Sequence, residues 1–224
     1  MQVLADRVPA GARLLDVGCG TGFFLEAAAT RYAVQGLDPS SAAVTYCHER
    51  GLMNVAEGTA ERLPGEDAGG PFDAVCLLDV IEHLDDDVAA LREAARVTRP
   101  GGHLLVTVPA HQWLWSPHDE INQHRRRYSR AGLVGALGAA GWAGIEATHF
   151  NCFLLPLAMA GIAAERLRRG SLVARLAVPP APINRLLEGI FTAEGPRLRG
   201  SRLRGFPFGL SLIATAVRPA VTAS

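Results

Sequence analysis

Three glycines at alternate positions, Gly18, Gly20 and Gly22, lie between an apolar run and a helical segment. Glycine permits a tight turn and lets a ligand approach the backbone closely. A dinucleotide-binding loop has the spacing G-x-G-x-x-G, and here the third glycine comes one residue early. Asp16 precedes the loop and would repel a pyrophosphate, so the pattern favours a ligand that carries positive charge. Asp38, 16 residues after Gly22, could accept hydrogen bonds from both hydroxyls of a ribose.

Three histidines could act as a general base, because an imidazole exchanges its proton near neutral pH. His83 follows Glu82 after a strongly apolar run, whereas His111 and His124 lie in a later segment rich in Trp, His and Arg. For His83 the alternative is a structural role or a place in the wall of a cofactor pocket. The histidine spacings in the later segment fit no compact pair of metal ligands, so no metal site is expected.

The same later segment holds candidates for substrate binding. Planar arginine forks bind carboxylate or phosphate, and tryptophans supply an apolar wall. The predicted substrate residues are therefore Trp113, Trp115, Arg126, Arg127 and Tyr128. The alternative is an ordered loop in which Arg126 or Arg127 pairs with Asp119 or Glu120.

Short apolar runs alternate with helical segments up to about residue 110, which is typical of βαβ units around a parallel sheet. We expect an α/β, doubly wound (Rossmann-like) and mostly parallel sheet, with helices on both faces and a helical insertion before the last strand. The predicted strands are Leu14–Val17, Val34–Leu37, Asn54–Glu57, Phe72–Leu78, His103–Val108, one through Ile145 to His149, and Leu210–Val217. Arg99-Pro100-Gly101-Gly102 is expected to separate a helix over Val88–Val97 from the fifth strand.

About 60 residues separate the last two predicted strands, far more than an ordinary loop. Within them, a predicted helix over Phe153–Ala164 is apolar on nearly all faces and runs into an arginine cluster, and a second helix is predicted over Ile183–Ala193. The first helix has three interpretations: a lid over the substrate pocket, a dimer contact or a membrane-surface anchor. The expected division is a cofactor-binding core over 1–150, an insertion over 151–208 and a final strand over 209–224.

Five motifs in order resemble those of the class I methyltransferases that use S-adenosylmethionine. They are D-V-G-C-G-T-G at 16–22, G-L-D-P-S at 36–40, E-G-T-A-E-R-L-P at 57–64, F-D-A-V-C-L-L-D at 72–79 and R-P-G-G at 99–102. Glu82-His83 also resembles a pattern of small-molecule members of this family. Five motifs at suitable spacing are far more specific than one glycine loop.

The resemblance implies a role for each cofactor residue. The backbone of Gly18, Cys19 and Gly20 would pack against the methionine part of S-adenosylmethionine, with Asp16 near the ammonium group. Asp38 would hold the ribose, and Leu78 would offer its carbonyl to the ammonium. The remaining predicted cofactor residues are Pro39, Thr59 and Ala60 around the adenine, and Asp79. Many relatives have Asp where this chain has Thr59, so the adenine contact differs here.

Charge divides the chain into two halves. All 22 basic residues are Arg, which excludes lysine chemistry such as a Schiff base. Residues 1–124 have a net charge of −10 and residues 125–224 a net charge of +10, although the total is zero. The basic half is expected to meet something anionic, or to neutralise the acidic half across the fold.

These observations predict an S-adenosylmethionine-dependent methyltransferase that acts on a small molecule. The preferred interpretation is that the methyl group goes to an oxygen atom of an anionic or lipid-like acceptor. The alternatives are a catalytically silent S-adenosylmethionine-binding regulator and a nucleic-acid methyltransferase. Nucleic acid is not the expected partner, because no basic stripe alternates with stacking aromatics. The start of the sequence lacks a signal-peptide pattern and the four cysteines form no C-x-x-C. A cytoplasmic monomer or homodimer is expected, with peripheral contact to the inner face of the membrane as an alternative.

Overall fold

The computed structural model describes residues 1–65, 70–167, 185, 187, 189–190, 192–198, 200 and 202–220. A seven-stranded sheet runs through its centre in the order β3-β2-β1-β4-β5-β7-β6. All neighbouring pairs are parallel except those made by β7, which is antiparallel to both β5 and β6. The strands are β1 (Arg13–Val17), β2 (Ala33–Asp38), β3 (Val55–Glu57), β4 (Phe72–Leu78), β5 (Thr98–Pro109), β6 (Ala143–Phe150) and β7 (Ser211–Val217). The predicted doubly wound, mostly parallel sheet is confirmed.

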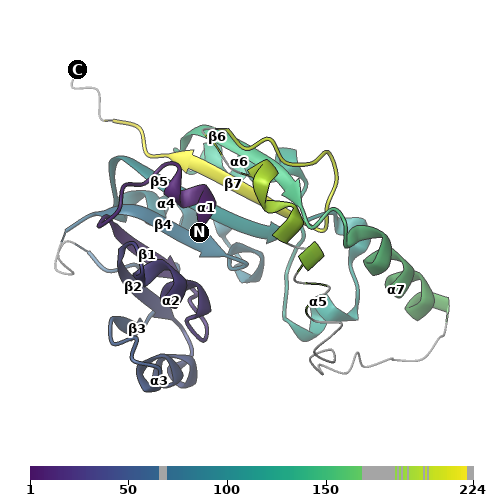
Figure 1. Cartoon of the computed structure of the whole chain (residues 1–224), viewed down its shortest axis with the longest axis horizontal. Helices are drawn as coiled ribbons and strands as arrows, with labels where there is room; N and C mark the ends of the chain where they lie inside the picture. Colours follow the sequence, from purple (N-terminus) through teal and green to yellow (C-terminus); the bar gives the residue numbers. More distant parts are fainter. Residues whose placement is uncertain are drawn as a thin grey trace.

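Helices cover both faces of the sheet (Figure 1). On one face, α4 (Asp87–Val97) and α6 (Arg130–Ala139) bury Leu91 and Leu133 in the largest apolar cluster. On the other, α1 (Gln2–Ala5) and α2 (Phe23–Ala29) pack Leu4 and Ala28 against the sheet. α3 (Ser41–Glu49) lies beside β3 at the edge of the sheet. Burial of this apolar surface is the main force that holds the layers together.

Two local features differ from expectation. β5 begins at Thr98, so the predicted turn Arg99–Gly102 is part of the strand. Its ladder extends because Gly101 donates to the carbonyl of Arg218 at 2.9 Å and Arg218 donates to the carbonyl of Gly102 at 2.9 Å. A short helix, α5 (Pro117–Ile121), begins at a capping box in which Ser116 and Asp119 exchange hydrogen bonds.

The insertion leaves the sheet at Phe150 and returns at Ser211, and these two residues are paired in the β6–β7 ladder. From there α7 (Leu155–Leu167) extends outward from the sheet (Figure 1). Of the helix predicted over residues 183–193, positions 183, 184, 186, 188 and 191 lie outside the described residues, and the other positions are helical. Arg168 and Arg169 of the arginine cluster also lie outside the described residues. Among the helices that the structure describes, none has the length and apolar character that a membrane crossing requires.

Candidate functional site

The glycine loop between β1 and α2 has the backbone geometry that only glycine adopts without strain. Gly18, Gly20 and Gly22 have φ of +70°, +52° and +79°. The amide of Gly18 donates to the carbonyl of Leu37 at 2.7 Å, which ties the loop to the end of β2. A Cβ on Gly18 would lie 2.6 Å from Cγ2 of Val80, so the loop passes close to the segment after β4. The loop and both strand ends therefore form one rigid edge.

Asp38 ends β2 and is held by two backbone amides. Its Oδ2 accepts from the amide of Gly20 at 2.8 Å, and its Oδ1 accepts from the amide of Ser40 at 2.9 Å. Ser40 in turn caps α3 through the amide of Ala43. The carboxylate lines a hollow of about 340 Å³ at the carboxyl edge of the sheet. This hollow is also lined by Gly18, Pro39, Thr59, Ala60 and Asp79, all of which are predicted cofactor residues.

Asp16 and Cys19 lie within this edge. Asp16 is 2% exposed, and burial, followed by the nearby charge of Asp38, raises its pKa to about 8. Burial and the charge of Asp16 also raise the pKa of the Cys19 thiol to about 12, so Cys19 is no thiolate nucleophile. An ammonium group bound beside Asp16 would favour its charged form. Leu78 lines a different hollow, together with Phe24.

A second and larger hollow of about 620 Å³ adjoins the first, and Asp79 and His83 line both. Asp79 has a φ of +55°, and its amide donates to the carbonyl of Thr107 at 3.0 Å. The hydroxyl of Thr107 donates to Oδ1 of Asp79 at 3.2 Å. The contacts with β5 thus hold Asp79 where the two hollows meet.

Two histidines and a buried glutamate converge in the larger hollow. His83 and His124 lie with ring centroids 4.8 Å apart. One ligand atom from each of Glu82, His83 and His124 lies within 4.8 Å of the others, so these residues could together hold a metal ion. Burial, and then His124, lowers the pKa of His83. The fold brings together residues that are distant in the sequence, which the local histidine spacings could not reveal.

Sequence reasoning missed several residues of this hollow. Glu82 is fully buried, and neither of its carboxylate oxygens has a hydrogen-bond partner among the described residues. Burial raises its pKa to about 8. Asn151, Ile162 and Ser211 reach the hollow from the ends of the insertion. Asn151, Ile162 and Ser211 are far apart in the sequence, so no local pattern links them to this hollow. Glu82 could have been identified from the sequence, because it is next to His83.

Hydrogen bonds from the backbone and the side chains connect the segment 82–87 with the segment 124–128. The amide of Arg125 donates to the carbonyl of Glu82 at 2.8 Å, and its Nε donates to the carbonyl of His83 at 2.9 Å. Nη2 of Arg126 donates to the carbonyls of Leu84 and Asp85 at 2.8 and 2.9 Å. These bonds set His124 beside His83.

Arg126, Arg127 and Tyr128, which the sequence predicts to bind substrate, all make contacts within the protein. Arg126 is used in holding the 84–87 segment, and Arg127 makes a two-point ion pair with Asp119, the pairing expected from the alternative. Tyr128 is 6% exposed, and its hydroxyl donates to Oδ2 of Asp87 at 2.5 Å. Arg127 still borders the larger hollow, but its guanidinium is engaged.

The other residues predicted in this segment lie apart from the histidine cluster. His111 stacks on His149, with ring centroids 5.0 Å apart, and contacts Trp113. Burial and the charge of Arg127 lower the pKa of His111. Trp113 is 56% exposed and Trp115 is half-buried, and neither lines the two hollows.

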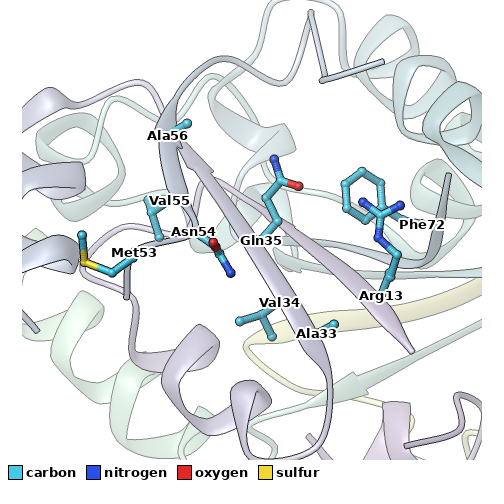
Figure 2. Close-up of a pocket in the computed structure, with 9 residues that line it drawn as sticks. All are labelled: Arg13, Ala33, Val34, Gln35, Met53, Asn54, Val55, Ala56 and Phe72. Carbon is cyan, nitrogen blue, oxygen red and sulfur yellow. The ribbon is translucent and has the colours of Figure 1, made fainter. Parts of the chain in front are cut away.

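Figure 2 shows another hollow, at the opposite end of the strands. Arg13 and Phe72 lie side by side there, with the guanidinium carbon 4.8 Å from the ring centroid. Arg13 also donates to the carbonyl of Gly70 at 2.7 Å. Ligands of doubly wound sheets bind at the carboxyl ends of the strands, so we place the site at the Asp38 and Asp79 edge.

The structure is thus a doubly wound domain with a carboxylate-lined hollow beside a second, histidine-lined hollow at the carboxyl edge of its sheet. Residues 15–106 match the family model described as a methyltransferase domain. This part of the chain is a class I S-adenosylmethionine-dependent methyltransferase domain.

Curated relatives agree with this assignment, and solved structures share the fold. The ubiquinone biosynthesis O-methyltransferase of Caulobacter vibrioides is 41% identical over 109 residues, which cover 46% of this chain and 43% of that protein. The matched region therefore spans less than half of that relative's length. The Haemonchus contortus phosphoethanolamine N-methyltransferase 2, in complex with S-adenosyl-L-methionine, has a TM-score of 0.62 at 18% identity and covers 98% of this chain and 52% of that one. A [4+2]-cyclase, SpnF, has a TM-score of 0.60 at 26% identity, covering 97% of this chain and 79% of that one.

Proposed function

We propose that this protein transfers a methyl group from S-adenosylmethionine to an oxygen atom of a small molecule that has both a hydroxyl group and an apolar part. One observation carries the proposal: Asp79 and His83 line both the hollow beside Asp38 and the adjoining histidine-lined hollow. A group bound at Asp38 and an acceptor beside His124 would therefore meet at this junction. The relatives described as O-methyltransferases support oxygen as the acceptor atom.

The cofactor residues fit the nucleoside part of S-adenosylmethionine. Asp38 is fixed by the amides of Gly20 and Ser40 and presents its carboxylate to the hollow, as recognition of ribose hydroxyls requires. A side chain at Gly18 would collide with Val80, so the loop must remain bare for a ligand to approach it closely. When bound, S-adenosylmethionine supplies an electrophilic methyl group on a sulfonium.

The residues of the larger hollow would orient the acceptor and take its proton. An acceptor hydroxyl must lose a proton as its oxygen becomes bonded to the methyl carbon, and an imidazole of His83 or His124 can accept it. Ala158, Ile162 and Leu210 supply an apolar wall, and Asn151 offers a buried amide oxygen that has no hydrogen-bond partner among the described residues. Because Arg126 and Arg127 are engaged within the protein, an apolar acceptor fits this hollow better than a strongly anionic one.

The test is a labelled-methyl transfer screen with alkyl-substituted phenols and catechols, fatty acids and primary amines. We expect transfer to hydroxyl-bearing acceptors, with a rate lowered about 100-fold or more in His83→Ala or His124→Ala. His103→Ala is the matched control, because His103 lies near the opposite end of β5. Binding of S-adenosylmethionine without transfer to any acceptor would favour the silent regulator. Transfer to amines alone would overturn the choice of oxygen.

A further inference from the structure

The cluster of Glu82, His83 and His124 presents two imidazole nitrogens and a carboxylate oxygen to one point. All three ligand atoms lie within 4.8 Å of one another. Two histidines and a carboxylate form a common ligand set for Zn²⁺ and similar divalent transition metals. The cluster lies in the wall of the larger hollow, so a metal there would remain accessible to a bound molecule.

The buried carboxylate of Glu82 is the strongest indication of a cation site. Its side chain is fully buried, and both carboxylate oxygens lack a hydrogen-bond partner among the described residues. A buried polar group without a partner costs free energy, so native proteins nearly always supply one. Coordination of a cation would give the Glu82 carboxylate the partner that it lacks among the described residues.

Asp119 fixes the orientation of the His124 ring. In metal sites, a carboxylate commonly binds one ring nitrogen of a histidine in this way while the other nitrogen binds the metal. Nδ1 of His124 lies 2.9 Å from Oδ1 of Asp119, which leaves Nε2 of the same ring for a ligand. Asp119 is fully buried and is itself held by Arg127, through contacts of 2.7 and 2.9 Å. These contacts hold the Asp119 carboxylate in place to accept the ring N–H of His124.

The scaffold also fixes the other two ligands. The amide and Nε of Arg125 bind the carbonyls of Glu82 and His83, so the two chain segments cannot separate without breaking these bonds. Asp79 lines the same hollow as His83 and His124 and is held there by Thr107. Prearranged ligands lose little conformational freedom on binding, which favours affinity.

We propose that Glu82, His83 and His124 bind one divalent transition-metal ion of the Zn²⁺ type, with a remaining coordination position open to the larger hollow. With the metal bound, His83 and His124 would act as ligands and not as the base. An acceptor hydroxyl at the open position would release its proton to solvent water more readily, because the metal stabilises the alkoxide or phenolate. This consequence for the acceptor rests on the proposed methyl transfer, whereas metal binding itself does not.

The experiment is calorimetric titration of the full chain, without an affinity tag and stripped by a chelator, with Zn²⁺ and separately with Mg²⁺. We expect one Zn²⁺ per chain and much weaker binding of Mg²⁺, which prefers oxygen ligands. Glu82→Gln and His124→Ala should each lower the affinity at least tenfold, and Asp119→Asn should lower it roughly 10- to 100-fold through the orientation of His124. The matched control is His111→Ala, which removes a histidine of the same segment outside the cluster and should leave the affinity unchanged.

Binding to Co²⁺ gives a second readout, because its visible absorption reports the number and type of ligands. The wild-type spectrum should change in Glu82→Gln, a replacement of nearly equal volume. Retained S-adenosylmethionine binding in each variant shows that the domain is still folded. Absence of saturable Zn²⁺ binding, or Zn²⁺ binding that Glu82→Gln and His124→Ala leave unchanged, would overturn the metal site while leaving metal-free methyl transfer intact. Zn²⁺ binding without methyl transfer would uphold the site and count against the proposed function.

Discussion

Arg127 and Asp119 form a two-point ion pair, with Nε to Oδ1 at 2.7 Å and Nη2 to Oδ2 at 2.9 Å. Asp119 is fully buried, so this pair is shielded from solvent. The same carboxylate also binds the ring of His124 and the amide of Ser116. One acidic side chain therefore connects the start of α5, the arginine segment and the histidine cluster.

Loss of Arg127 should destabilise the protein strongly. Arg127→Ala leaves a buried carboxylate without its counter-charge, and removal of one partner of a buried pair costs about 3–5 kcal/mol. Urea unfolding at pH 7 measures the change in the free energy of unfolding. Asp85→Ala is the control, because Asp85 is mostly exposed and its pair with Arg125 should contribute under about 1 kcal/mol. Equal effects of the two substitutions would contradict the role assigned to Asp119.

Two glycines of the loop should respond differently to alanine. Gly20→Ala meets nothing within 4 Å, so it should cost only about 1–2 kcal/mol for the left-handed backbone. Gly18→Ala adds a clash with Cγ2 of Val80 and should cost more and weaken S-adenosylmethionine binding. Thermal unfolding and calorimetry measure both effects. Restoration of stability by Val80→Ala in the Gly18→Ala background would identify the clash as the cause, and no restoration would refute it.

Asp38→Asn should weaken S-adenosylmethionine binding about 10- to 100-fold. The carboxylate loses its charge toward the ribose hydroxyls, and a hydrogen bond to a charged group contributes about 1.5–3 kcal/mol. Isothermal titration calorimetry at constant pH gives the affinity. Glu57→Gln is the control, because Glu57 is exposed at the end of the neighbouring strand β3. If Asp38→Asn bound as tightly as the wild type, the ribose assignment would be wrong.

Asp16 should make the ligand-free protein less stable as the pH rises. Its folded pKa of about 8 lies above the value of 3.8 for a free side chain, so the folded state binds the proton more tightly. The stabilisation is therefore fully present below about pH 4 and is lost progressively up to about pH 8. Each pH unit in this window can cost up to about 1.4 kcal/mol.

The measurement is the difference in unfolding free energy between wild type and Asp16→Asn from pH 5 to 8, which cancels the other titrating groups. That difference should shift against the wild type as the pH rises. Bound S-adenosylmethionine should reduce the slope, because its ammonium favours the ionised carboxylate. A difference that is independent of pH would show that Asp16 is already ionised in the folded protein.

The sequence predicted the parallel half of the sheet well because local periodicity determines it. The apolar runs at Leu14–Val17 and Phe72–Leu78 coincide closely with β1 and β4. β5 was predicted to be shorter because its first residues, around two glycines, pair with Arg218 far along the chain. No local pattern carries such a contact.

The cofactor edge could be predicted from its motifs, whereas the histidine hollow could not. Pro39, Thr59 and Ala60 lie around the same hollow as Asp38 because each follows a parallel strand. In the later segment, the choice between a substrate-binding and a structural arginine depends on which acid is buried nearby. The pattern Ser116 to Asp119 indicates the start of a helix. Only the fold reveals that Asp119 is fully buried and forms an ion pair with Arg127. The contact of Tyr128 with Asp87 could not be predicted for the same reason, because Asp87 lies 41 residues earlier.

The pairing of Phe150 with Ser211 bears on how proteins of this architecture diversify. The long insertion departs and returns at one ladder rung, so its length and content place no demand on the strand register. Genetic exchange of this segment between relatives would then alter the wall around Asn151 and Ile162 while the cofactor edge stays intact. We expect a chimaera joined at Phe150 and Ser211 to keep the sheet register, so that a change in acceptor preference could be assigned to the exchanged segment.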